Sequence, residues 1–119
     1  MKSFVGQKSE AFALRIVNLY RHLTDKKKEY IIAKQVLRAG TSIVANLSES
    51  DFSFSKKEYL AKVYISLKEC SETLYWLRLL NNSRLITQKQ FDSIYIDCEE
   101  LVKLPTKTVK TLKNSLEKK

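Results

Sequence analysis

A heptad repeat of mostly apolar residues in the stretch 59–81 constrains the fold of this chain more than any other feature. Seven positions follow the repeat, at alternating spacings of three and four residues: Leu60, Val63, Leu67, Cys70, Leu74, Leu77 and Asn81. This spacing predicts the apolar side of a helix that packs lengthwise against other helices. Because burying one large aliphatic side chain contributes roughly 1.5–3 kcal/mol, we expect neighbouring helices to cover it. Further apolar residues lie beside the repeat and widen this surface beyond what one partner helix would hide: Tyr64, Tyr75, Trp76 and Leu80.

Apolar residues also recur at helical spacing in three other stretches: about 6–23, about 29–50 and the region after position 87. Ser55 and Glu58 form a capping-box pattern at the start of the heptad helix. The run 81–83, Asn-Asn-Ser, predicts its end, because asparagine tolerates the left-handed conformation that terminates helices. Asp25 and Thr87 are the candidate N-caps of the second and the fourth helix.

Two residues inside these stretches break the helical pattern. Gly40 costs about 1 kcal/mol relative to alanine in a helix, which predicts the close approach of a neighbouring helix at that turn. Pro105 lacks a backbone donor and clashes with the preceding turn. The last helix therefore either kinks at Pro105 or ends before it, and a second short helix then follows.

The composition favours an all-helical protein. Two Gly and one Pro in 119 residues are too few to punctuate a many-stranded sheet, and 44% hydrophobic residues suffice for a core. Long helices with short connections pack as antiparallel neighbours. We therefore predict an all-α fold, an antiparallel up-and-down four-helix bundle that forms one domain over residues 1–119, with a basic C-terminal tail over residues 106–119.

The positive charge of the chain is large and unevenly distributed. The formal net charge is +9, which favours polyanionic partners such as nucleic acid or an anionic membrane surface, although a basic surface can also serve solubility alone. The candidate nucleic-acid-binding residues fall in three clusters: Lys26, Lys27 and Lys28; Lys56 and Lys57; Lys107, Lys110 and Lys113. Phe54 and Tyr59 beside the second cluster either stack on bases or close the end of the bundle.

The sequence contains no pattern that is typical of an enzyme, a metal site or a cofactor site. His22 is the single histidine and falls on the polar side of the first helix. Cys70 and Cys98 fall on core-facing positions of adjacent helices, which favours small buried side chains over redox or metal roles. The first seven residues lack the apolar stretch of a secretory signal, and no apolar run approaches the roughly 18 residues of a membrane span. We therefore expect a cytoplasmic protein that does not bind a membrane.

The segment from position 35 to position 72 resembles a known family. Residues 35–50 read QVLRAGTSIVANLSES, residues 55–59 read SKKEY, residues 64–67 read YISL, and Glu72 follows. These motifs resemble those of the four-helix-bundle proteins encoded in intervening sequences of bacterial 23S ribosomal RNA genes. The chain departs from the usual family pattern at four positions: Leu37, Val44, Leu47 and Ser50.

This resemblance implies a four-helix up-and-down bundle that assembles as a ring-shaped homo-pentamer. A related accessory protein of diversity-generating retroelements is a basic pentameric barrel that binds nucleic acid and associates with a reverse transcriptase. By this analogy the partners of the chain are further copies of itself, RNA or DNA, and a reverse transcriptase. For most of the family no activity is established.

Four polar residues belong to the family-like segment: Arg38, Asn46, Glu49 and Glu72. They form either a nucleotide-phosphate site or a hydrogen-bonded network that fixes helix register or subunit contacts. Arg38 and Glu49 are roughly 16 Å apart along one helix, so they cannot pair within it but could pair across a ring interface. We favour the structural interpretation.

Our leading hypothesis is a non-enzymatic, oligomeric helical bundle that binds RNA or DNA without sequence preference through its basic surfaces. The alternative is a protein–protein interaction adaptor with no nucleic-acid role. A small hydrolase is disfavoured because no catalytic constellation is present.

Overall fold

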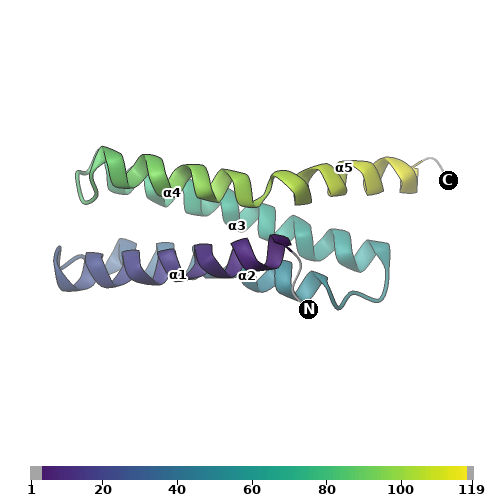
Figure 1. The fold of residues 1–119 in the computed structure, drawn as a ribbon, viewed down its shortest axis with the longest axis horizontal. Helices are drawn as coiled ribbons and strands as arrows, with labels where there is room; N and C mark the ends of the chain where they lie inside the picture. Colours follow the sequence, from purple (N-terminus) through teal and green to yellow (C-terminus); the bar gives the residue numbers. More distant parts are fainter. Residues whose placement is uncertain (1–3, 118–119) are drawn as a thin grey trace.

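The computed structural model describes residues 4–117, and this part of the chain is entirely helical, without a strand (Figure 1). It contains five helices: α1 (Phe4–Asp25), α2 (Ile31–Ser50), α3 (Lys56–Asn82), α4 (Gln88–Leu101) and α5 (Lys103–Glu117). The first three helices agree with the predicted stretches to within a few residues. The last two residues of the predicted basic tail, 118 and 119, lie outside the described part.

The helices form an antiparallel bundle in which α4 and α5 together take the fourth position (Figure 1). α1 packs on α2 and α4, and α3 packs on α2, α4 and α5. α5 continues roughly in line with α4, past the start of α1, and covers the N-terminal half of α3. The described molecule is elongated, with extents of 53 × 28 × 22 Å.

The sequence left open whether the last helix kinks at Pro105 or ends before it. The structure shows that it ends and that a second helix follows. α4 ends at Leu101, Val102 interrupts the helix, and α5 begins at Lys103. Pro105 therefore lies in the first turn of α5. Its missing N–H costs no hydrogen bond there, because the first backbone donors of a helix have no intrahelical partner.

Only half of the buried positions of α3 belong to the predicted heptad repeat. The fully buried positions are Val63, Ser66, Cys70, Thr73, Leu77 and Leu80. The predicted Leu60, Leu67 and Leu74 are only partly buried at the edge of the core. The prediction passed over Ser66 and Thr73 because they are polar. Each hydroxyl has a carbonyl partner, however: Ser66 donates to Ile43 O of α2 at 2.7 Å, and Thr73 donates to Glu69 O at 2.8 Å.

Gly40 marks a close helix approach, as predicted, and the neighbour is α1. A Cβ atom at position 40 would lie 2.8–2.9 Å from three side-chain atoms of Ile16. Ile16 is completely buried. The absence of a side chain at Gly40 therefore sets the distance between α1 and α2.

Two of the three predicted N-caps are confirmed. Ser55 accepts a hydrogen bond from Glu58 N at the start of α3, and Thr87 and Gln90 form a complete capping box on α4. The prediction for Asp25 was wrong, because Asp25 is the last residue of α1 and Tyr30 precedes α2. The Glu29 carboxylate instead accepts hydrogen bonds from the N–H groups of residues 32 and 33 at the start of α2.

α3 ends at Asn82, within the predicted run 81–83, but the left-handed residue that follows is Arg84 and not an asparagine; Lys28 is the left-handed residue beyond the end of α1. Lys28 (φ 55°) and Arg84 (φ 62°) both have left-handed backbones. After each, the next N–H bonds back along the helix, from Glu29 N to Leu23 O and from Leu85 N to Leu80 O, both at 2.9 Å. The bond from Leu85 to Leu80 has the spacing of the Schellman motif, in which glycine is the usual left-handed residue, whereas the bond from Glu29 to Leu23 spans one residue more.

The two cysteines are buried in the core between α3 and α4. Their Sγ atoms are 3.4 Å apart, and both thiols are free. The hydrogen bond with Cys70, together with burial, raises the pKa of the Cys98 thiol, so Cys98 stays protonated at neutral pH. None of the helices in the described part of the chain is apolar over the length that a bilayer requires.

Candidate nucleic-acid interface

Lysines of two of the three predicted clusters lie at one end of the bundle, whereas Lys107 of the α5 cluster lines another pocket with Leu74 and Glu99. A pocket of about 440 Å³ lies at the corner between the α2–α3 loop and α5, and Leu112 of α5 lines it opposite Lys56 and Tyr59 of α3. Lys113 directly follows Leu112 in α5, and Lys110 lies on the preceding turn. The α5 lysines thus come close to Lys56 and Lys57, although more than 50 residues separate them in the sequence. All of these lysines are exposed. We call this end the loop end.

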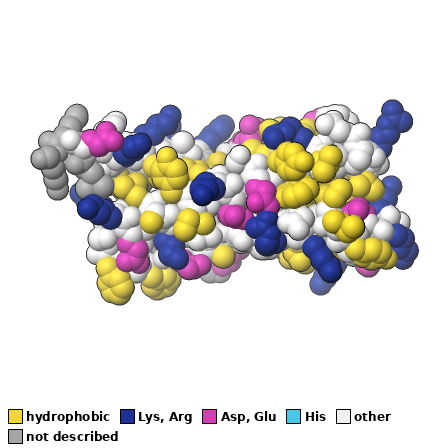
Figure 2. Space-filling view, turned by 180° about the vertical axis from the view of Figure 1, so that it is seen from behind, with side chains coloured by type: hydrophobic (Ala, Val, Ile, Leu, Met, Phe, Trp, Pro, Cys, Tyr) yellow, Lys and Arg dark blue, Asp and Glu magenta, His cyan; other side chains and the backbone are white. Residues whose placement is uncertain are grey.

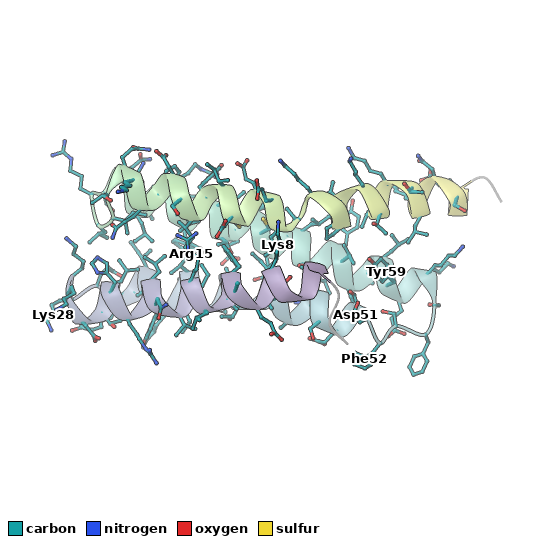
Figure 3. The ribbon with its side chains drawn as sticks, viewed as in Figure 1. Lys8, Arg15, Lys28, Asp51, Phe52 and Tyr59 are labelled. Atoms are coloured by element: carbon teal, nitrogen blue, oxygen red, sulfur yellow. The ribbon has the colours of Figure 1, made fainter. Side chains whose placement is uncertain are left out.

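The third lysine cluster lies at the opposite end of the molecule. Figure 3 shows Lys28 at one extreme of the long axis, and Asp51, Phe52 and Tyr59 towards the other. Lys26, Lys27 and Lys28 are exposed in the α1–α2 connection. The predicted cationic surface is therefore divided between two ends of the bundle.

Two exposed phenylalanines extend from the loop end. The exposed fraction is 80% for Phe52 and 96% for Phe54, and Figure 3 shows Phe52 at the outer edge of the loop. The suggestion that Phe54 closes the end of the bundle was therefore wrong. Tyr59 does pack against the core, because it stands within α3, whereas Phe54 precedes the helix cap.

Local hydrogen bonds fix the conformation of the loop that carries these rings. The backbone N–H groups of Asp51 and Phe52 donate to the last carbonyls of α2, those of Ser48 and Glu49. On the other side, the Phe54 N–H donates to the Glu58 carboxylate at 3.4 Å. The loop is thus held by the ends of two helices, and its aromatic side chains remain exposed.

The pocket at the loop end also contains acceptors and hydroxyl groups. The lining includes Asp51, Ser53 and Tyr59. The Ser53 Oγ atom is buried and has no hydrogen-bond partner among the described residues. Burial and, secondarily, the Asp51 carboxylate raise the pKa of the Tyr59 phenol, so its hydroxyl remains a donor at neutral pH.

Arg38 is held by α3 and not by Glu49. Its guanidinium pairs with Glu69 at 3.2 Å and with Glu72, and Glu72 also accepts from the Trp76 indole N–H at 2.9 Å. Two carboxylates surround this one cation, which disfavours phosphate binding there. Glu69 was not singled out from the sequence. The signal was its spacing, because residues three apart, such as Glu69 and Glu72, lie on the same face of a helix.

The other two polar residues of the family-like segment also have partners within the chain. Glu49 pairs with Lys62 of α3 at 3.0 Å. The Asn46 side chain donates to Ser42 O of the same helix at 2.8 Å. These contacts join α2 to α3 or stay within α2, and they do not bring the four residues into one site.

A second pocket, of about 290 Å³, lies between α1 and α4 near His22. Arg15 lines it and pairs with Asp97 at 2.6 Å while also donating to Ser93 Oγ at 2.9 Å. Both polar groups of this ion pair are thus already satisfied. Within the described residues, no three His, Cys, Asp or Glu side chains converge on a possible metal position.

Comparisons with known proteins agree with the fold. No curated protein sequence matches this chain. A crystal structure of a protein of unknown function from the S23 ribosomal protein family of Bacteroides thetaiotaomicron superposes with a TM-score of 0.87 at 45% identity, covering 89% of this chain and 98% of that one. The family model of the 23S rRNA-intervening sequence protein matches residues 1–107. The chain therefore belongs to the family of 23S rRNA-intervening sequence proteins.

Proposed function

We propose that this protein is a non-enzymatic, cytoplasmic bundle that binds RNA or DNA without sequence preference through its loop end. The observation that carries this proposal is the approach of α5 to the start of α3, where Lys56 and Leu112 line one pocket beside two exposed phenylalanines and Lys113 directly follows Leu112. Lysines neutralise phosphates and release their counterions, which supplies most of non-specific binding.

Self-association strengthens this binding in our proposal. The solvent-facing side of α3 carries Tyr64, Ile65 and Tyr75, each 43–50% exposed. Figure 2, which views the molecule from the α2–α3 side, shows hydrophobic side chains among charged ones. Five copies of a +9 chain, the number implied by the family resemblance, would carry +45. A ring of this kind converts weak contacts into intramolecular ones with a high effective concentration.

Binding to a labelled mixed-sequence oligonucleotide over a salt series tests the nucleic-acid proposal. We expect the logarithm of the binding constant to fall steeply with the logarithm of the salt concentration. The variant that replaces Lys56, Lys57, Lys110 and Lys113 with Gln should bind more weakly. Its slope should be shallower by about 0.7–0.9 for each phosphate that these lysines no longer neutralise.

The variant that replaces Lys26, Lys27 and Lys28 with Gln is the matched control, because these lysines lie at the other end of the bundle. It should bind nearly as the parent does. Absence of binding at low salt would contradict the proposed function. An equal weakening of binding in the two variants would contradict the assignment to the loop end.

A further inference from the structure

The loop end combines three features that distinguish it from a merely basic surface. Its two phenylalanines are 80% and 96% exposed. Lys56 and Lys57 of α3 follow the two rings in the sequence, and α5 approaches the same loop through Leu112, which Lys113 directly follows. The adjoining pocket of about 440 Å³ is lined by a carboxylate and several hydroxyl groups.

The exposed rings need an apolar partner with accessible flat faces. Bases stack on aromatic side chains irrespective of sequence, because every base has a π-face. In a duplex these faces are covered by the neighbouring base pairs, whereas in a single strand they are accessible. Phe52 and Phe54 therefore favour unpaired nucleotides over double helices.

The pocket chemistry also suits a base better than a phosphate. Asp51 repels phosphate, but a carboxylate accepts hydrogen bonds from the amino groups of base edges. The buried Ser53 Oγ lacks a partner among the described residues, and a polar ligand would satisfy it. An anionic membrane surface fits less well, because Asp51 immediately precedes Phe52 and would enter the headgroups with it.

We propose that the α2–α3 loop is a site for single-stranded nucleic acid, in which Phe52 and Phe54 stack on unpaired bases and the α3 and α5 lysines hold the flanking phosphates. This inference rests on the proposed function and adds a strand preference to it. The other end of the bundle has one exposed aromatic residue, Tyr30, beside Lys26–Lys28, which provides an internal comparison.

The test measures fluorescence anisotropy with a labelled single strand of about 20 nucleotides, longer than one such site, and with the duplex of the same sequence. The parent protein should prefer the single strand by about 25-fold or more, since each of the two rings contributes about fivefold or more. The Phe52→Ala/Phe54→Ala variant should lose this preference, with single-strand affinity reduced about fivefold or more per ring, while duplex binding stays unchanged. Phe52→Tyr/Phe54→Tyr should retain the preference, because tyrosine also stacks.

The matched control is Tyr30→Ala, which removes an exposed ring beside lysines at the opposite end and should leave both affinities unchanged. Circular dichroism should show parental helicity for every variant, because the replaced side chains are exposed. Equal affinity of the parent for both nucleic acids, or retention of the preference in the Phe52→Ala/Phe54→Ala variant, would overturn the inference but leave the proposed function intact. Absence of binding to either nucleic acid would overturn both.

Vesicle binding tests the remaining class of partner, an anionic membrane surface. The parent protein is sedimented with vesicles of phosphatidylcholine and phosphatidylserine. We expect no co-sedimentation that depends on Phe52 and Phe54. Phenylalanine-dependent vesicle binding without a strand preference would overturn the inference in favour of a membrane surface.

Discussion

Gly40 shows how a single missing side chain can determine the packing of two helices. Glycine is unfavourable within a helix by about 1 kcal/mol, yet here the space that a Cβ would need is filled by Ile16 of α1. The sequence indicated a close approach at this position but not its partner, since the partner residue depends on how α1 and α2 are aligned. Ser66 and Thr73 illustrate the converse, because two polar residues occupy core positions by means of hydrogen bonds that a hydropathy pattern does not show.

Replacing Gly40 with alanine should lower the free energy of unfolding, although alanine is the better helix former. Overpacking typically costs 1–3 kcal/mol, so we expect a net decrease of up to about 2 kcal/mol after the gain of about 1 kcal/mol in helix propensity. Urea denaturation followed by circular dichroism measures this. Ala45→Gly, at an exposed position of the same helix, is the control and should cost about 1 kcal/mol.

The Ile16→Ala background isolates the contact itself. Gly40→Ala should be neutral or stabilising there, because the three side-chain atoms that it would meet are absent. The same destabilisation in both backgrounds would contradict the packing of Gly40 against Ile16.

At the scale of the helix, α3 separates what periodicity can predict from what it cannot. The repeat correctly indicated a long helix with neighbours along its length, and Ser55 marked its N-cap. It did not fix the rotation of the helix, because Leu67 and Ser66 are adjacent and hydropathy alone favours the leucine. The left-handed backbones of Lys28 and Arg84, which lie beyond the ends of α1 and α3, were also not predictable, since neither residue type favours this conformation.

The rotation of α3 predicts a difference between two leucines in the same repeat. Leu77 is completely buried, whereas Leu67 lies at the edge of the core. We expect Leu77→Ala to lower the free energy of unfolding by about 2–5 kcal/mol and Leu67→Ala to lower it by clearly less. Chemical denaturation of the two variants side by side measures the difference. Equal destabilisation, or a larger effect at Leu67, would indicate that the predicted heptad positions, including Leu67, form the buried side of α3.

At the scale of the whole molecule, the direction that α5 takes after Val102 determines where the C-terminal lysines lie. If α5 turned away from α4, its lysines would lie far from Lys56 and Lys57. Because α5 instead lies along the N-terminal half of α3, the tail and the α2–α3 loop share one end (Figure 1). The sequence identified the lysines of this candidate site but not their meeting, since α5 packs on α3 only through long-range contacts. The exposed state of Phe54 was equally inaccessible, because it depends on how the loop leaves α2.

Assembly is the property of the whole molecule that the exposed side of α3 predicts. We expect size exclusion with light scattering to show an oligomer for the parent protein and a monomer for Ile65→Lys/Tyr75→Lys, because these changes replace two of the exposed apolar side chains by which, in our proposal, copies contact one another. Leu14→Lys, at a 60% exposed apolar position on α1, is the control and should leave the mass unchanged.

The Ile65→Lys/Tyr75→Lys variant gains two positive charges per chain, so simple electrostatics would raise its affinity for nucleic acid. We expect its affinity to fall instead, because a monomer lacks the multivalent binding of the ring. A monomeric parent protein, or an Ile65→Lys/Tyr75→Lys variant that stays assembled, would remove this side of α3 as the contact between copies.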